Sequence, residues 1–180
     1  MRATAYLALV VLGCTAGTAG TANAQAICAM IAMYFVTPPS VFIDEHGERI
    51  RDAAAADDDD DDRRWKSRQK WPNADCEVSR SSTDVHAMTC KYNTGSNQET
   101  VNAFGKQAER DVDLCLQQIP NGQGYEKDTQ NRTFRGRATT TISWTKKTSD
   151  AVYAIQVRVD QDAKGVFSNS VSVVWGELSP

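Results

Sequence analysis

The sequence predicts an α+β domain in which one long amphipathic helix packs on an antiparallel sheet, in the order ββ-α-βββ. Residues 96–119 carry apolar side chains at helical spacing, and the segments on either side alternate polar and apolar residues with a period of two. Four cysteines follow a predicted export signal, and an even number in an exported domain indicates that disulfides staple the fold.

Residues 1–24 have the features of a cleaved signal peptide. Arg2 supplies a positive start, residues 6–12 form an apolar run, and Ala22-Asn23-Ala24 is an A-x-A cleavage site. The run is too short to cross a bilayer, so no transmembrane helix is expected. Cys14 offers a lipoprotein signal instead, but the leucine two positions before it is bulky for that motif. Both interpretations place the protein in the periplasm or outside the cell.

Three further segments are expected: an N-terminal apolar segment over 25–43, a linker arm over 44–70 and the α+β domain over 71–180. The apolar part of the first, 25–36, suits either a buried helix or a buried strand and is too short to span a membrane.

The linker arm is expected to be disordered, with an acidic part followed by a basic part. Ten acids and two arginines lie in 44–62, six of the acids being the consecutive run Asp57–Asp62, whereas 63–70 holds five bases and no acid. Like charges repel, so the run is expected to be solvated, and it lacks the convergent ligands of a calcium site. Trp65 and Trp71 flank the basic part and indicate that it docks on the domain.

The domain is expected to begin with a hairpin over residues 76–92. A register that pairs Cys76 with Cys90 also pairs Val78 with Met88, so both pairs share one face. This register favours a Cys76–Cys90 disulfide and leaves Cys28 to pair with Cys115, although four cysteines permit three connectivities.

The long helix is expected over Ser96–Ile119. Ser96 and Glu99 have the spacing of a capping box, and Pro120 follows its end. Glu109 and Asp113 are expected on its solvated side, offset by neighbouring bases. Its apolar face is formed by Val101, Phe104, Ala108, Val112, Cys115 and Ile119.

Three strands, over 136–144, 151–159 and 166–178, are expected to form a meander after the helix. Pairing Tyr153 with both Trp144 and Val173 places the large apolar side chains on the face under the helix. The opposite face is rich in hydroxyl groups, namely Thr139, Thr141, Ser143, Ser168, Ser170 and Ser172. Such a face suits a glycan platform, but glycan platforms usually add exposed aromatic rings, and the strand aromatics have the buried parity. An ordinary solvated surface is therefore the simpler interpretation.

No catalytic, cofactor-binding or metal-binding residues are assigned from the sequence. His86 is expected to be a half-exposed strand residue, and no serine or acid completes a triad with it. His46 lies in a polar turn beside two carboxylates, a setting that rarely holds precise geometry.

A second cluster of interest is basic. Arg132, Arg135 and Arg137, with Phe134 between them, could bind an anion or an acidic partner, although a solvated loop would also account for them.

The functional expectation is a small, non-catalytic binding or interaction protein of the periplasm or cell exterior, with a protein or small-ligand partner in the envelope and no cofactor. Residues 71–180 carry 12 bases and 13 acids, and this balance argues against nucleic acid as a partner. Two alternatives stay open: a secreted enzyme with a dispersed site, and a carrier that holds an apolar ligand between helix and sheet. The sequence does not define the oligomeric state.

Overall fold

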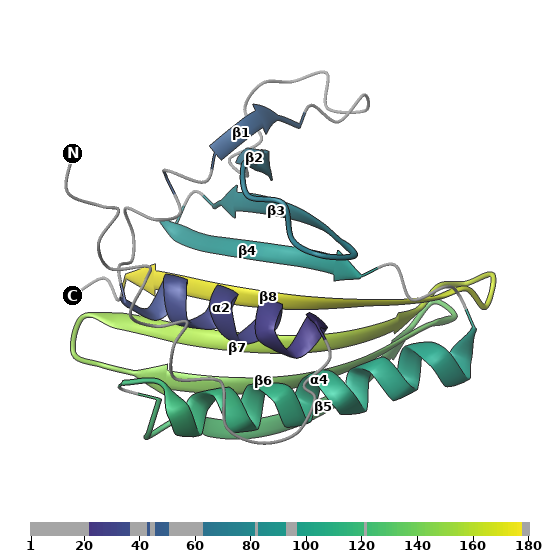
Figure 1. The fold of residues 1–180 in the computed structure, drawn as a ribbon. Helices are drawn as coiled ribbons and strands as arrows, with labels where there is room; N and C mark the ends of the chain where they lie inside the picture. Colours follow the sequence, from purple (N-terminus) through teal and green to yellow (C-terminus); the bar gives the residue numbers. More distant parts are fainter. Residues whose placement is uncertain are drawn as a thin grey trace.

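The computed structural model describes residues 22–36, 43, 46–50, 63–81, 83–92, 97–120 and 122–177. In this part of the chain eight strands form one antiparallel sheet in the order β1-β2-β3-β4-β8-β7-β6-β5. Two helices, α2 and α4, lie over the same face of the sheet (Figure 1). The predicted combination of helix and antiparallel sheet is present, but strands make up more of the domain than expected.

The helices are α2 (Ala22–Val36) and α4 (Gln98–Gln118). The strands are β1 (His46–Arg49), β2 (Arg63–Ser67), β3 (Ala74–Arg80), β4 (Val85–Tyr92), β5 (Glu126–Phe134), β6 (Arg137–Lys147), β7 (Ala151–Gln161) and β8 (Phe167–Glu177).

The order ββ-α-βββ is incomplete, because it lacks β1, β2, β5 and α2. Strand β5 escaped prediction because all nine of its residues are exposed, so it carries no apolar alternation. It is an edge strand held through its pairing with β6. Backbone pairing of this kind leaves little trace in a hydrophobicity pattern.

The expected linker arm over 44–70 has strands at both of its ends. Strand β2 pairs with β1 and with β3, where Trp65 lies opposite Val78. Trp71 is buried, so the basic part docks on the domain as its tryptophans indicated. Residues 51–62, which hold the aspartate run, lie outside the described residues.

Pairing within the sheet keeps the apolar side chains on one face. Cys76 pairs with Cys90 and Val78 with Met88, as predicted. The expected meander register was wrong on both sides of β7: Tyr153 pairs with Lys146 and Trp175, not with Trp144 and Val173. Because the error is two residues, every side chain keeps its expected face.

Helix α4 begins at a different cap from the one expected. The Asn97 side chain accepts hydrogen bonds from the backbone N–H groups of Glu99 and Thr100, at 2.8 and 3.3 Å, so Asn97 takes the place assigned to Ser96. A Cβ on Gly105 would lie 2.8 Å from a methyl carbon of Val159. Glycine at this position therefore allows α4 to lie close to β7.

The first of the two predicted disulfides, Cys28–Cys115, joins α2 to α4. Helix α2 is apolar, and its Ile27, Met30 and Ile31 side chains are fully buried. It begins at Ala22, so cleavage after Ala24 would remove only its first three residues and none of these buried side chains. The bridge therefore fixes a buried helix to the amphipathic one.

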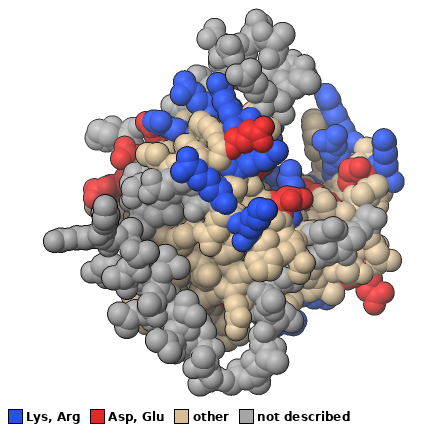
Figure 2. All heavy atoms as spheres, turned by 45° about the horizontal axis from the view of Figure 1, so that its top comes forward, with Lys and Arg blue, Asp and Glu red and all other residues tan. Residues whose placement is uncertain are grey.

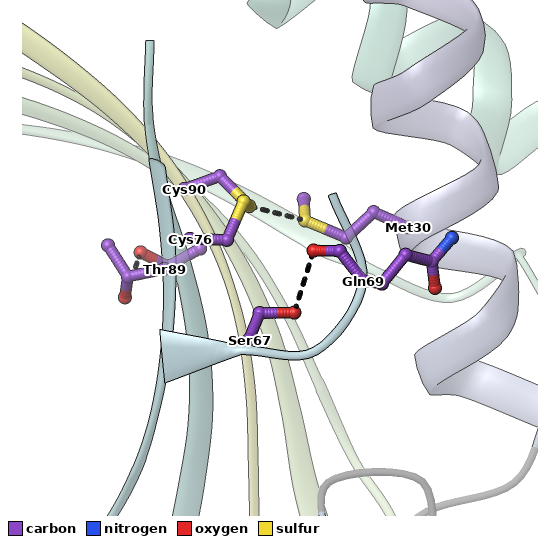
Figure 3. The surroundings of a disulfide bond; sticks show 7 residues. Met30, Ser67, Gln69, Cys76, Thr89 and Cys90 are labelled. Carbon is purple, nitrogen blue, oxygen red and sulfur yellow. Dashed lines mark hydrogen bonds between the residues drawn. A yellow bond between two sulfur atoms is a disulfide. The ribbon is translucent and has the colours of Figure 1, made fainter. Parts of the chain in front are cut away.

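The second predicted disulfide, Cys76–Cys90, joins β3 to β4. Figure 3 shows Met30 of α2 directed at this bridge, with 3.7 Å between its sulfur and Cys90 Sγ. Neither sulfur carries a proton, so this is a packing contact. Helix α2 thus packs against a covalently linked strand pair.

Candidate functional site

The two faces of the sheet differ in what covers them. The helix-covered face carries the core side chains of β4, β7 and β8. The other face, here called the open face, is not covered by any helix or strand in the described residues. One row across five neighbouring strands of the open face consists of Gln130, Thr141, Arg158, Ser170 and Lys91.

A hollow of about 430 Å³ lies on the open face over β5, β6 and β7. Its volume falls within the range of roughly 300–1,000 Å³ that is typical of small-molecule sites. All of its lining positions come from strands, which hold side chains more precisely than loops do. The hollow is lined by Gln130, Arg132, Phe134, Arg137, Thr139, Thr141, Ser143, Gln156 and Arg158.

The structure brings together two of the three predicted anion-binding arginines and adds another. Arg132 and Arg137 line the hollow from β5 and β6. Arg135 does not line it: it lies in the β5–β6 turn with a φ of 50°, and its guanidinium carbon is 5.0 Å from the centre of the Phe134 ring. Arg158 was missed. Arg158 alternates with apolar residues along β7, and this pattern places it on the open face. Its position beside Thr141, however, follows only from the pairing of β6 with β7.

Hydrogen bonds orient two of these arginines. An Arg132 Nη2 group donates to the side-chain oxygen of Gln130 at 2.9 Å, and the Gln130 amide donates to Asp128 at 3.0 Å. Arg158 forms an ion pair with Asp160, at 2.9 Å, and Thr139 also donates to Asp160, at 2.7 Å. A guanidinium has five N–H donors, so donors remain on both arginines.

Other polar side chains of the hollow have no such partner. Those of Arg137, Thr141, Ser143 and Gln156 make no hydrogen bond or ion pair with another described residue. The N–H donors of Arg137 are therefore left for a ligand, and its charge also acts on the Asp162 carboxylate. The three others add groups that both donate and accept hydrogen bonds.

A second basic region lies at the opposite end of the sheet. Figure 2 turns the β1–β3 end toward the viewer and shows several Lys and Arg side chains with fewer acids among them. Part of this charge is neutralised locally, because Lys66 pairs with Glu48 at 3.2 Å and Arg64 with Glu77 at 3.7 Å. The charged side chains here are spread over strand surfaces, and none of them lines the hollow on the open face.

The two histidines belong to the structure of the sheet rather than to the hollow. His46 stacks on Trp65 with 3.8 Å between ring centres. His86, expected to be half-exposed, is buried, because it pairs with Trp175 on the helix-covered face. Burial lowers the pKa of both imidazoles, and the charge of nearby Arg80 lowers it further.

Glu109 and Asp113 of α4 are half-buried beside β5, not on the solvated side of the helix as expected. Glu109 and Asp113 bind Lys127 of β5 at 2.8 and 2.7 Å, and the Trp144 indole N–H donates to Asp113 at 2.7 Å. The unpredicted strand β5 places Lys127 beside them. Burial alone would lower the pKa of Lys127, but its hydrogen bonds to both carboxylates outweigh burial and raise it. This cluster ties α4 to the sheet.

Among the described residues, no helix is both long and apolar enough to cross a membrane. Likewise, their His, Cys, Asp and Glu side chains include no group of three placed to hold a metal ion. The chain matches no protein-family model, and comparisons with curated proteins and with solved structures give no match.

Proposed function

We propose that this protein is a small, exported binding protein without catalytic activity, and that the hollow on its open face takes an anionic ligand. The observation that carries the proposal is the presence of Arg132, Arg137 and Arg158 in one hollow. They come from three neighbouring strands, so the backbone pairing of the sheet fixes their spacing.

The chemistry of the lining supports an anion over a cation or an apolar molecule. The planar guanidinium binds carboxylate, sulfate or phosphate oxygens through two parallel N–H groups. The lining includes no acid, and Asp160, two positions beyond the lining residue Arg158, is already bound by Arg158 and Thr139. The core between helix and sheet, where an apolar ligand would have to lie, is filled by side chains such as Ile155, Met88 and Val112, none of which is exposed.

Export is part of the proposal. It is supported by the signal-peptide features of residues 1–24 and by the two disulfides, which persist in oxidising compartments. A partner or ligand in the periplasm or outside the cell would meet the open face directly.

Amide-resolved NMR titration tests the proposal. The oxidised protein would be titrated with sulfate, pyrophosphate, citrate and trigalacturonate, and at least one should shift the amides of residues 137–143 and 156–158. Arg137→Gln should weaken that binding by about tenfold, since a charge-assisted hydrogen bond contributes about 1.5–3 kcal/mol.

Lys147→Gln is the matched control for this experiment. Lys147 is exposed on the same strand and the same face as Arg137, but ten residues away, or ~33 Å along the strand. Its substitution removes the same charge without touching the hollow. Absence of shifts with every anion, or equal weakening by both variants, would contradict the proposal.

A further inference from the structure

We infer that the anionic ligand is an acidic saccharide, a short chain of sugar units that carry carboxylate or sulfate groups. The inference rests on the proposed anion site and adds to it the chemistry of the rest of the hollow. Three features of the lining point to a sugar rather than to a small inorganic anion or an acidic peptide.

The first feature is the length of the hollow. Its lining on β6 runs from Arg137 to Ser143, six residues or ~20 Å, and it extends across three strands, ~10 Å. A single phosphate or sulfate would occupy only a small part of this space. The extent suits an elongated ligand lying along β6.

The second feature is the mixture of donors and acceptors beyond the arginines. Thr141, Ser143 and Gln156 line the hollow with hydroxyl and amide groups that have no partner among the described side chains. Each can both donate and accept. A simple anion offers acceptors only, whereas a sugar hydroxyl does both, so the lining matches a ligand rich in hydroxyl groups.

The third feature is an exposed aromatic ring at the arginine end of the hollow. Phe134 is 69% exposed, the most exposed of the large hydrophobic residues described, and it lines the hollow. The C–H faces of sugar rings are apolar and stack on aromatic rings. Glycan platforms usually provide such a ring; β5, which the alternation pattern did not reveal, supplies one here.

Arg135 strengthens this assignment by its place over the Phe134 ring. Its guanidinium lies 5.0 Å from the ring centre, within the range of a cation–π contact, so it holds a positive charge beside the exposed ring. The turn that presents both residues is fixed by positive φ angles at Arg135 and Gly136, which are typical of a two-residue hairpin turn.

Calorimetric titration of the oxidised protein with three matched trimers tests the inference. Trigalacturonate should bind at least tenfold more tightly than neutral maltotriose, which lacks the charge, and at least tenfold more tightly than triglutamate, which lacks the sugar rings. Sulfated maltotriose carries sulfate groups, whereas trigalacturonate carries carboxylates. Binding of either supports the inference, and the tighter of the two identifies the charged group that the hollow prefers.

Variants then assign the contacts. Phe134→Ala should weaken binding of the acidic trisaccharide about fivefold or more, and Arg137→Gln about tenfold. Val166→Ala removes another exposed apolar side chain, one outside the hollow, and should change nothing. All three positions are exposed, so thermal unfolding should confirm that each variant is folded.

The outcomes separate this inference from the proposed function. Equal binding of triglutamate and trigalacturonate, with no effect of Phe134→Ala, would overturn the saccharide and leave the anion site standing. If maltotriose bound as tightly as trigalacturonate, the arginines would have no role in binding. Both the saccharide inference and the proposed anion site would then be overturned. No binding of any charged trimer, together with no response to the inorganic anions, would also overturn both.

Discussion

The two faces of the sheet differ in burial: one packs against the helices and the other is open. Successive residues of each strand point to opposite faces. In β7, Ile155 and Val157 are buried under the helices, whereas Gln156 and Arg158 line the hollow. Both disulfides lie with the helices, one between α2 and α4 and one against Met30. Stability is therefore concentrated on the helix-covered face, which leaves the side chains of the open face available for binding.

The largest expected effect is loss of the Cys28–Cys115 bridge. The disulfide closes a loop with a sequence separation of 87 residues. On the chain-entropy model, its removal by Cys28→Ser with Cys115→Ser should reduce the free energy of unfolding by about 4–5 kcal/mol. Urea unfolding of the oxidised proteins measures the difference. Cys76→Ser with Cys90→Ser, which opens a shorter loop of separation 14, should cost about 3 kcal/mol. An unchanged unfolding midpoint for both pairs would contradict the structural role of the disulfides.

A pair of single substitutions compares the faces directly. Ile155→Ala should cost about 2–5 kcal/mol, because it leaves a cavity in the core under the helices. Thr141→Ala, on the open face of the neighbouring strand, should change stability by no more than about 0.5 kcal/mol. The same urea experiment measures both. Similar losses for the two variants would show that the open face also contributes packing.

Sequence patterns predicted the helix-covered face well, because burial leaves a periodic trace. The spacing of Val101, Ala108 and Val112 identified α4, and the alternation around Tyr153 identified the meander. Both disulfides followed from the hairpin register and the even number of cysteines. In these elements the side chains that face the core have to be apolar, and this requirement is visible in the sequence.

The open face was predicted less well, because polar side chains on a solvated strand obey no strict pattern. Strand β5 is exposed throughout, so the segment that holds Arg132 was interpreted as a solvated loop. The neighbours of Arg158 and Phe134 across the sheet depend on pairing between strands that the sequence does not specify. The linker arm over 44–70 also proved to be part of the sheet at both of its ends, so deleting it would remove β1 and β2 and uncover β3.

Lowering the pH should reduce the free energy of unfolding through His86, which is buried on the helix-covered face. Burial lowers the pKa of His86 in the folded state below its ordinary 6.5, so the stability due to the neutral imidazole is present above pH 6.5 and is lost as pH falls through the folded value. Asp111, whose pKa burial raises, gives the opposite slope. The test is therefore the comparison of His86→Phe with the unmodified chain in urea unfolding between pH 5 and 8. The variant should lose less stability on acidification; parallel curves would contradict this role.

The smallest expected effect concerns the polar contact that joins α4 to the sheet. Lys127→Met removes the ion pairs with Glu109 and Asp113, whose side chains are 32% and 40% exposed. Solvent screens such pairs, so the loss should be about 0.5–1 kcal/mol and should shrink further in 1 M salt. Lys147→Met, which removes an exposed lysine outside this cluster, serves as the control. A loss above about 2 kcal/mol would mean that this polar cluster, rather than the apolar side chains beneath α4, holds the helix in place, and the contrast between the faces would then rest on charge as well as on packing.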